Sequence, residues 1–440
     1  MNSPAHPALA TAKATDPARV DLRALAERIF ADAAAMSPDR VGLSRPAYSA
    51  VESRMLDYLE ETARGLGLET WRDAGDNLVI AAPGDTDPAA RAGYFGSHVD
   101  TVPEGGNYDG LAGVVAGLLA LLANVREGTS AGRVPLRVLA LRGEESAWFG
   151  RAYMGSLALF GRLGGAALEA RRRDGVGTLA DAMRETGLPV ARIAAGEPLV
   201  DPKSFAFFVE LHIEQGPVLV ERKWPVAGVT GIRGNIRHRE IRCLGEAGHS
   251  GAVPRWLRRD AVFAMCELVM RMDEHWATIQ QHGGDLVLTT GIVQTDPAHH
   301  AMSRIPGEVS FSFEARSLDA GTLEAVERLA HAEARAIERD RGVRFLFDDP
   351  VRSAPATLDP AILQAILAEA EAEGLPGETV PSGAGHDAAV FAQAGVPSGM
   401  IFVRNTKGSH NPDEHMEIDD LMAAVRVMTR LGKTLVDRAR

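Results

Sequence analysis

Residues 94–125 contain an apolar run, a polar loop and a longer apolar run, in the order YFGSHVDTVPEGGNYDGLAGVVAGLLALLANV. The first run, Tyr94–His98, is short and is typical of a buried strand, whereas Leu111–Val125 is too long for a strand and indicates a buried helix. A strand that leads into a helix is the repeating unit of layered α/β proteins. The loop between the two runs carries imidazole and carboxylate groups, so this stretch predicts both a fold and a place for a site.

The same alternation of strands and helices extends along most of the chain. We expect helices over 20–36, 46–65, 359–373, 387–394 and 419–437, helical segments near 150–190, and strands near 68–71, 77–81, 136–141, 205–213 and 398–403. This order predicts an α/β domain with a mixed, largely parallel sheet. At roughly 150 residues per domain, the 440-residue chain is also too long for one core.

A different rhythm begins after Gly234. The patterns predict, in order, strand 236–244, helix 257–278, strands 286–293 and 308–316, helix 319–338 and strand 343–347. This βαββαβ order is typical of a ferredoxin-like module. We therefore expect a flexible tail over 1–20, a discontinuous catalytic domain over 21–232 and 353–440, and an inserted domain over 233–352.

Composition and charge argue against several classes of protein. The chain has 59 acidic and 47 basic residues, a formal charge of −12, and no sustained basic stripe, so nucleic acid is not an expected partner. Leu111–Val125 is shorter than the roughly 20 residues needed to span a bilayer, so no membrane association is expected. The two cysteines form no C-x-x-C pair, which favours a reducing, cytoplasmic location.

Five segments place imidazole or carboxylate groups beside predicted strand ends: GSHVD (96–100), NYDG (107–110), GEE (143–145), ELHIEQG (210–216) and GSHNP (408–412). Ligands of open α/β folds gather outside the carboxyl ends of strands. Each segment alone is more often structural, but a charged end on the apolar strand Phe205–Ile213 needs a partner. Three imidazoles with carboxylates form the ligand set of zinc, manganese, cobalt or nickel.

Longer blocks around these segments carry a resemblance: GSHVDTVPEGGNYDGLAGVVAGL (96–118), RGEES (142–146), ELHIEQGPVL (210–219), GEAGHSGAVP (245–254), PSGAGHDAAVFA (381–392) and GSHNPDE (408–414). They resemble the hydantoinase/carbamoylase branch of the dinuclear metallopeptidase superfamily. That branch includes N-carbamoyl-L-amino-acid hydrolases, allantoate amidohydrolase and β-ureidopropionase. The resemblance covers nearly the whole chain from about residue 20, and it implies a zinc-peptidase-like catalytic domain.

The resemblance assigns a role to each matched residue of the site. It implies five ligands for two divalent metal ions: His98 and His212 on one, Glu145 and His410 on the other, and Asp109 bridging both. Asp100 would hold the second nitrogen of His98. Two cations about 3.5–4 Å apart lower the pKa of a bridging water and stabilise the oxyanion formed by its attack. Glu144 would act as the general base and pass the proton to the leaving nitrogen.

The inserted domain is expected to act as a lid and a dimerisation module. The resemblance implies that His249 of one subunit reaches the site of its partner, and the alternative is a structural histidine in a Gly-rich turn. Arg316 would grip the substrate α-carboxylate bidentately, and the alternative is a surface salt bridge. Gln215 and Gly385 are expected to contact substrate, while His386 buttresses its turn.

Two segments depart from the pattern of the family. Family members typically read PNxxNVIPG, but residues 296–307 are longer here and place Ser303 where the second Asn is expected. His299, His300 or Arg304 can substitute for that Asn, and a solvated loop is the alternative. Residues 404–407 replace a small or Pro-Ser segment, and Arg404, close to His410, can recognise an anionic or polar group. Both changes leave the metal ligands intact and alter the expected pocket.

The favoured function is that of a homodimeric, metal-dependent amidohydrolase that cleaves a linear amide or ureido C–N bond. Its expected substrate is a small, amino-acid-derived molecule, an N-carbamoyl-L-amino acid, which would give the amino acid, ammonia and carbon dioxide. One alternative is a deacylase or amidase that acts on N-acyl amino acids or on another ureido acid such as allantoate. A second is a binding protein that kept the fold and lost turnover, although all five ligands and Glu144 are present.

Overall fold

The structure is a computed structural model that describes residues 20–128 and 134–439, so the predicted tail falls almost entirely outside the described residues. The chain forms two compact units. The first unit comprises the chain up to Thr230, Leu358–Ser382 and His386–Arg440. The second unit comprises Gly231–Thr357 together with the three-residue segment Gly383–Gly385, a segment that the expected boundaries of 233–352 do not include.

The larger sheet is mixed. Its strand order is β1 (Glu69–Arg72), β2 (Leu78–Ala81), β4 (Leu136–Leu141), β3 (Ala92–His98), β5 (Phe205–Ile213), β17 (Ser398–Val403), β6 (Val226–Ile232) and β15 (Ala356–Thr357), with β16 (Thr379–Ser382) also paired to β6. The central pairs β4–β3, β3–β5 and β5–β17 are parallel, and the flanking pairs are antiparallel. The predicted α/β class with a mixed sheet is confirmed, but the sheet is partly rather than largely parallel, because its parallel pairs are confined to the centre.

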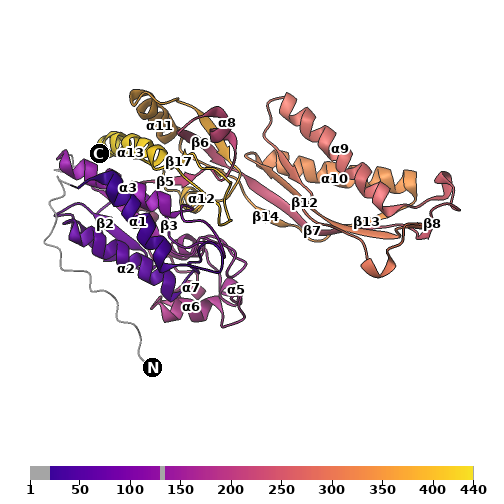
Figure 1. Cartoon of the computed structure of the whole chain (residues 1–440), viewed down its shortest axis with the longest axis horizontal. Coiled ribbons are helices and arrows are strands. Elements are labelled where there is room, and N and C mark those ends of the chain that lie inside the picture. Colours follow the sequence, from indigo (N-terminus) through magenta and orange to yellow (C-terminus); the bar gives the residue numbers. More distant parts are fainter. Residues whose placement is uncertain (1–19, 129–133, 440) are drawn as a thin grey trace. The chain divides into compact units, whose positions relative to one another are not determined.

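Helices cover both faces of this sheet (Figure 1). Along β5, Phe207 and Val209 point into one core, whereas Phe208 stacks on Phe391 from the other face with a centroid distance of 3.9 Å. The first face carries α1 (Leu22–Met36), α2 (Ala50–Gly65), α3 (Leu111–Arg126), α11 (Pro360–Ala372) and α13 (Ile418–Arg438). The second face carries α12 (Asp387–Gln393), which packs against α4 (Met154–Leu159). Shorter helices follow in the connections: α5 (Gly165–Leu168), α6 (Leu179–Glu185), α7 (Val190–Ala194) and α8 (Val218–Arg222).

Helix α3 is the element that places the polar loop of residues 99–110. Its residues from Leu111 to Leu122 are all buried, as expected from their apolar character. Gly113 allows close approach to β5, because a Cβ there would lie 2.0 Å from the carbonyl oxygen of Leu211. Gly110 has a φ of +67°, and a Cβ there would lie 2.5 Å from the ring of His98. These two glycines bring the start of α3 against the ends of β3 and β5.

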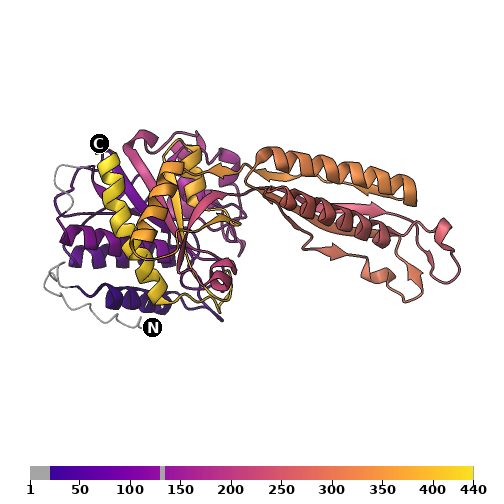
Figure 2. The same ribbon diagram turned by 90° about the horizontal axis from the view of Figure 1, so that it is seen from above.

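The second unit contains the smaller sheet, with the order β10 (Val293–Gln294), β12 (Glu308–Ser317), β7 (Gly234–Leu244) and β13 (Arg344–Leu346). Two short strands extend it, because β9 (Val287–Thr289) pairs with β12 and β14 (Val351–Ser353) pairs with β7. Residues of α9 (Ala261–Gln281) and α10 (Ala320–Arg341) share one core with alternate residues of β12, so both helices cover one face (Figures 1 and 2). The element order is the βαββαβ order predicted from the sequence.

The elements that the sequence did not predict are short or rich in glycine. Strand β6 has the sequence VAGVTGI, and its two glycines weaken the strand pattern. The predicted strand 286–293 is divided into β9 and β10 on either side of Gly291. Over residues 20–128 and 134–439, no helix is long and apolar enough to cross a membrane.

Candidate metal centre

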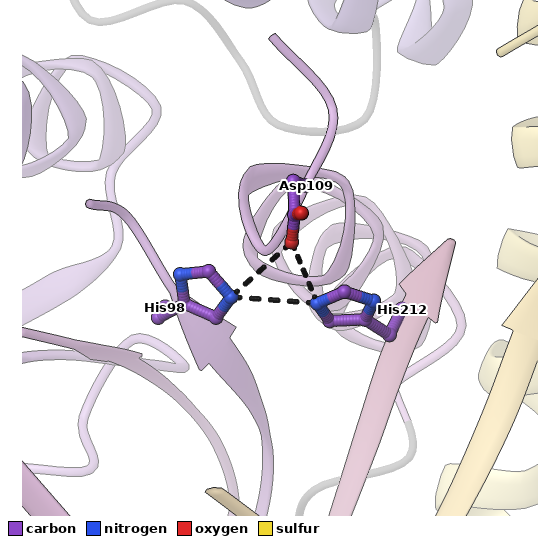
Figure 3. A group of neighbouring side chains, drawn as sticks. All are labelled: His98, Asp109 and His212. Carbon is purple, nitrogen blue, oxygen red and sulfur yellow. Dashed lines mark hydrogen bonds and ion pairs between the residues drawn. The ribbon is translucent and has the colours of Figure 1, made fainter. Parts of the chain in front are cut away.

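Three buried side chains converge where β3, β5 and the start of α3 meet (Figure 3). His98 ends β3, His212 lies near the end of β5, and Asp109 precedes α3. Asp109 Oδ1 lies 3.5 Å from His98 Nε2 and 3.0 Å from His212 Nε2, and the two Nε2 atoms lie 3.4 Å apart. The strands are adjacent and parallel, so their carboxyl ends bring both imidazoles to one edge of the sheet.

The protonation of these two imidazoles follows from their other nitrogen. His98 Nδ1 lies 3.1 Å from the carbonyl oxygen of Asp100, and His212 Nδ1 lies 2.9 Å from that of Ile213. A carbonyl oxygen only accepts hydrogen bonds, so each Nδ1 carries a proton and Nε2 is the nitrogen that faces Asp109. In the neutral ring, each Nε2 would present a lone pair to a cation beside the carboxylate oxygen. The three residues therefore fit a divalent metal ion.

A second group of ligands faces the other oxygen of Asp109. His410 Nε2 lies 3.4 Å from Asp109 Oδ2 and 3.5 Å from Glu145 Oε1. Asp109 thus offers one oxygen to each group, which is the arrangement of a bridging carboxylate. His410 has a φ of 61°, in a region that residues other than glycine seldom occupy. Backbone strain of this kind is common where function dictates the position of a side chain.

Glu144 lies beside His98 and Glu145, one residue from each group. Its carboxylate, that of Glu145 and the ring of His98 have atoms within 4.8 Å of one another. The carboxylate of Asp100 accepts hydrogen bonds from the main-chain N–H of Glu144 at 3.0 Å and of Glu145 at 2.9 Å. Asp100 therefore orients the two glutamates, and its carbonyl oxygen, at 3.1 Å, holds Nδ1 of His98.

A buried ion pair supports the segment that carries the two glutamates. Glu52 Oε1 accepts a hydrogen bond from the N–H of Gly143 at 2.9 Å, and Oε2 accepts one from Nε of Arg142 at 2.8 Å. Neither side chain of this pair is exposed to solvent. Burial raises the pKa of Glu52 to about 7. The carboxylate of Glu52, a residue of α2, thus fixes the turn that precedes Glu144.

The charges of the centre favour bound cations. Burial raises the pKa of Glu144 well above its usual range, and it raises the pKa of Glu145 to about 8. The hydrogen bond to Asp109 raises the pKa of His410 to about 9, although burial acts in the opposite direction. Carboxylates gathered in a buried place are mutually repulsive, and divalent cations relieve that repulsion.

Two residues that the sequence analysis did not single out hold the carboxylate of Asp109. Ser409 Oγ lies 2.5 Å from Asp109 Oδ2 and 2.8 Å from Glu414 Oε2. Glu414 Oε1 accepts hydrogen bonds from the main-chain N–H of Tyr108 at 2.9 Å and of Asp109 at 3.1 Å. Both residues belong to the matched block GSHNPDE, and their place in that block was the sequence signal that could have identified them. Supporting contacts of this kind fix the geometry of metal ligands.

Gln215, a predicted substrate contact, also touches Asp109. Its Nε2 donates to Asp109 Oδ2 at 2.9 Å, and its main-chain N–H donates to Asn405 Oδ1 at 3.0 Å. Its Oε1 is buried and accepts no hydrogen bond from the described part of the chain. The φ of Gln215 is 62°. The side chain is therefore held at the centre with an acceptor still available.

Two further predicted residues of the first unit are bound to neighbouring side chains. Arg404 donates from Nε and Nη2 to the carboxylate of Asp420 at 2.7 and 2.9 Å, so Asp420 holds its guanidinium and neutralises part of its charge. His386 is buried, with Nε2 2.9 Å from Ser382 Oγ and its ring centroid 4.4 Å from that of His212. Burial lowers the pKa of His386 well below its usual range, so the ring is neutral.

The remaining predicted residues lie in the second unit. His249 is exposed in β8 (Gly248–His249), which pairs with β11 (Arg304–Ile305), and Ser303 accepts a main-chain hydrogen bond from Ser250 at 2.8 Å. The structure thus brings His249 and Ser303 together on one short ribbon. Of the two loop histidines, His299 pairs with Asp296 at 2.9 Å, and His300 lies 2.7 Å from Thr295 Oγ1.

Arg316 extends from β12 of the same unit. It donates to the carbonyl oxygen of Gly383 and lies 3.1 Å from a carboxylate oxygen of Glu314. Gly385, two residues after Gly383, belongs to the same unit. Arg316 and Gly385 therefore lie in one compact body, and the metal ligands lie in the other.

Comparison with known proteins identifies the family. Residues 94–434 match peptidase family M20/M25/M40. An N-carbamoyl-L-amino acid amidohydrolase from Geobacillus stearothermophilus is 34% identical over 88% of this chain and 92% of its own. Allantoate deiminase 2 from Glycine max is 30% identical over 87% of this chain and 83% of its own.

A solved structure supports the same family assignment. A hydantoinase/carbamoylase-family amidase from Burkholderia multivorans superimposes with a TM-score of 0.81 at 27% identity, covering 95% of this chain and 98% of that one. The predicted resemblance to the hydantoinase/carbamoylase branch is confirmed, as is the prediction of a hydrolase that acts on carbon–nitrogen bonds other than peptide bonds. The chain is a member of peptidase family M20/M25/M40.

Proposed function

We propose that the protein hydrolyses the ureido group of an N-carbamoyl-L-amino acid with two divalent ions of the zinc, manganese, cobalt or nickel class. The observation that carries this proposal is the convergence of four candidate ligands, His98, His212, Glu145 and His410, on the carboxylate of Asp109, with Glu144 beside His98 and Glu145. The name of the Geobacillus stearothermophilus relative supports the substrate class. The ligand types suit all four metals, and availability selects among them.

The division of labour follows from the position of each group. Bound divalent ions supply a water of lowered pKa and polarise the substrate carbonyl. Glu144 accepts the proton of that water and delivers it to the leaving nitrogen, and its raised pKa suits a group that must both take and give a proton. Asp100 holds Glu144 through its main-chain N–H, so the base does not need to reorganise during the reaction.

Recognition of the amino-acid part of the substrate falls to residues of both units. Arg316 has the planar guanidinium that binds a carboxylate bidentately, and it now donates to the carbonyl oxygen of Gly383 and pairs with the carboxylate of Glu314 on its own strand. We propose that the second unit acts as a lid that supplies Arg316, Gly385 and Ser303 to the bound substrate. The buried amide oxygen of Gln215 is suited to accept a hydrogen bond from a ureido N–H.

Allantoate is the second candidate substrate, since the soybean allantoate deiminase relative is nearly as similar as the carbamoylase. The departures at Ser303 and Arg404 lie in segments expected to contact substrate, so they bear on this choice. An N-acyl amino acid would use the same ligands and the same base. The two ureido acids carry an amino group on the scissile carbonyl and so release ammonia, whereas an N-acyl amino acid carries an alkyl group there and releases none.

A substrate panel separates these candidates. The metal-loaded enzyme is assayed for ammonia with N-carbamoyl-L-amino acids and allantoate, and for free amine with N-acetyl-L-amino acids. We expect the highest kcat/KM with an N-carbamoyl-L-amino acid and none with its D enantiomer. Turnover of allantoate alone would favour the second candidate, and turnover of acyl substrates alone would contradict both. Glu144→Gln controls for a contaminating hydrolase.

We further propose a homodimer formed through the second unit. This unit exposes large apolar side chains, with Trp256 83%, Phe263 61%, Met270 58% and Val293 53% exposed. Phe263 and Met270 are seven residues apart and share one face of α9, and Val293 lies on the edge strand β10. Unpaired edges and apolar stripes are typical of interfaces. His249 of one subunit would then reach the site of its partner.

The solution mass tests this assembly. Light scattering of the wild type should give twice the chain mass, and the double variant Phe263→Asp/Met270→Asp should shift it to the monomer. A matched variant of an exposed apolar residue in the first unit, Val41→Asp, should leave the mass unchanged. A monomeric wild type would overturn the dimer.

A cytoplasmic location is also proposed, because both Cys243 and Cys266 are free thiols.

A further inference from the structure

The second unit contains another imidazole–carboxylate cluster, at the contact of β7 with α10. It consists of His238 on β7 and Glu327 and His331 on α10, and we refer to it as the β7–α10 cluster. One ligand atom from each of the three residues lies within 4.8 Å of the others. His238 Nε2 lies 3.8 Å from Glu327 Oε1. No residue of this cluster belongs to the matched blocks or takes part in the proposed reaction.

The orientation of His238 points to a bound cation. Its side chain is only 3% exposed, and Nδ1 lies 3.0 Å from both the carbonyl oxygen and Oδ1 of Asp348. Both partners only accept, so Nδ1 carries a proton and Nε2 is the nitrogen that faces the cluster. Nε2 is buried and takes part in no hydrogen bond within the described part of the chain. Buried polar atoms normally have partners, so this one needs an explanation.

The geometry of α10 supplies two further ligands from one face. Glu327 and His331 are four residues apart on the helix, so their side chains are neighbours. Arg352 Nη2 lies 2.6 Å from Glu327 Oε1 and holds this carboxylate in place. The ring of Phe347 lies against His331 with a centroid distance of 4.1 Å. Burial lowers the pKa of His331, so its imidazole is neutral and able to bind a metal.

We propose that His238, Glu327 and His331 form a mononuclear site for a divalent transition ion, with Zn²⁺ as the probe. In a tetrahedral zinc site with bonds of about 2.0–2.1 Å, ligand atoms lie about 3.3 Å apart. The observed spacings are wider, with 3.8 Å between His238 Nε2 and Glu327 Oε1 and all three ligand atoms within 4.8 Å of one another, so the proposal requires the side chains to move closer when the ion binds. Asp348 plays the part of the carboxylate that orients a metal-bound histidine. The ion would tie β7 to α10 and thereby stabilise the second unit.

The bound metal per chain tests this site. Full-length protein is stripped with a chelator, reloaded with Zn²⁺, freed of excess metal and analysed by mass spectrometry for zinc. We expect wild type to hold one more zinc per chain than His331→Ala. The matched control is His275→Ala, which removes another half-buried histidine of this unit, one that pairs with Glu333 at 3.0 Å. His275→Ala should hold as much zinc as the wild type.

Equal zinc in wild type and a folded His331→Ala would overturn the proposal and leave the cluster as a simple ion pair. Glu327→Gln provides a second variant if His331→Ala does not fold, and it should also lose the extra ion. Because the readout is a difference between variants, it does not depend on how many ions the catalytic centre holds. Asp109→Asn separates the two sites: it should lose ions of the centre and keep the zinc that His331→Ala loses.

Discussion

The molecule contains two imidazole–carboxylate clusters that are built in opposite ways. The centre in the first unit draws its ligands from five separate segments, between residues 98 and 410, that meet at the ends of parallel strands. The β7–α10 cluster draws two of its three from consecutive turns of one helix, against an antiparallel sheet. The centre forms only when the whole domain folds, whereas two of the three residues of the β7–α10 cluster are already neighbours once α10 forms.

The surroundings of the two clusters differ as much as their origins. The centre contains several carboxylates, and its bridging residue is held by Ser409, Gln215 and Glu414. The β7–α10 cluster has one carboxylate, held by Arg352, and an aromatic ring packed on His331. An excess of negative charge suits two cations and a reacting water. A single carboxylate with two imidazoles suits one ion that has a structural role.

Removal of metal is expected to have the largest effect on turnover, and this effect should come from the centre in the first unit. Treatment with a chelator should abolish turnover, because the centre then lacks the ions that activate water. Adding back zinc, manganese, cobalt or nickel should restore it. The measurement is the initial rate of ammonia release from an N-carbamoyl-L-amino acid. Full activity in protein shown to be metal-free would contradict the assignment of the centre.

Substitution of the base should lower turnover without removing the metal. Glu144→Gln keeps the shape of the side chain but cannot accept a proton, so kcat should fall by about 10²–10⁴-fold. The zinc content should equal that of the wild type. Glu373→Gln, which removes a surface carboxylate paired with Arg426, is the control and should leave kcat unchanged. Wild-type rates in Glu144→Gln would mean that another group takes the proton.

Loss of the contact that positions the bridging carboxylate should have a smaller effect. Glu414→Gln weakens the hold on the main chain of Asp109, and metal affinity should fall by about 10–100-fold. Competition with a chelator of known affinity measures this change. Glu417→Gln, three residues away and paired with the exposed His415, should behave as the wild type. Equal affinities for all three proteins would show that Glu414 has no part in metal binding.

The number of protons released when zinc binds should also differ between the two clusters, and this is the smallest of the expected effects. The pKa of His410 is raised to about 9, so at pH 7 this imidazole must lose a proton before it binds an ion. The pKa of His331 is lowered, so the β7–α10 cluster should release none from this residue. Titration calorimetry with Zn²⁺ in buffers of different ionisation enthalpy measures the number of protons released. His331→Ala reports on the centre alone, and Asp109→Asn reports on the β7–α10 cluster. Release by the centre should shrink as the pH rises through about 9.

The two clusters also show what can be predicted from sequence. The ligands of the centre lie in blocks such as GSHVDTV and ELHIEQGPVL, and the alternation of strands and helices indicates that these segments meet at strand ends. The contact of Asp100 with the main chain of Glu144 and Glu145 needs coordinates, because it depends on the exact path of a turn. The pairing of Arg404 with Asp420 of α13 is likewise a tertiary contact between segments 16 residues apart.

The β7–α10 cluster could not be predicted in the same way. Glu327 and His331 have the spacing of a helical pair, which is common on any solvated helix, and His238 lies 89 residues before Glu327. The register of β7 in the smaller sheet decides whether His238 points toward α10, and a shift by one residue would turn it away. The fold of the second unit followed from its hydrophobic periodicity, but the division of 286–293 into β9 and β10 did not.

The central claim is that Asp109 bridges two cations, and diffraction at metal absorption edges tests it most directly. Crystals of the zinc-loaded enzyme, with data collected on both sides of the zinc edge, should give two anomalous peaks about 3.5–4 Å apart at the ends of β3 and β5. One peak should contact His98 and His212, the other Glu145 and His410, and both Asp109. A single peak, or peaks that do not contact Asp109, would contradict the account.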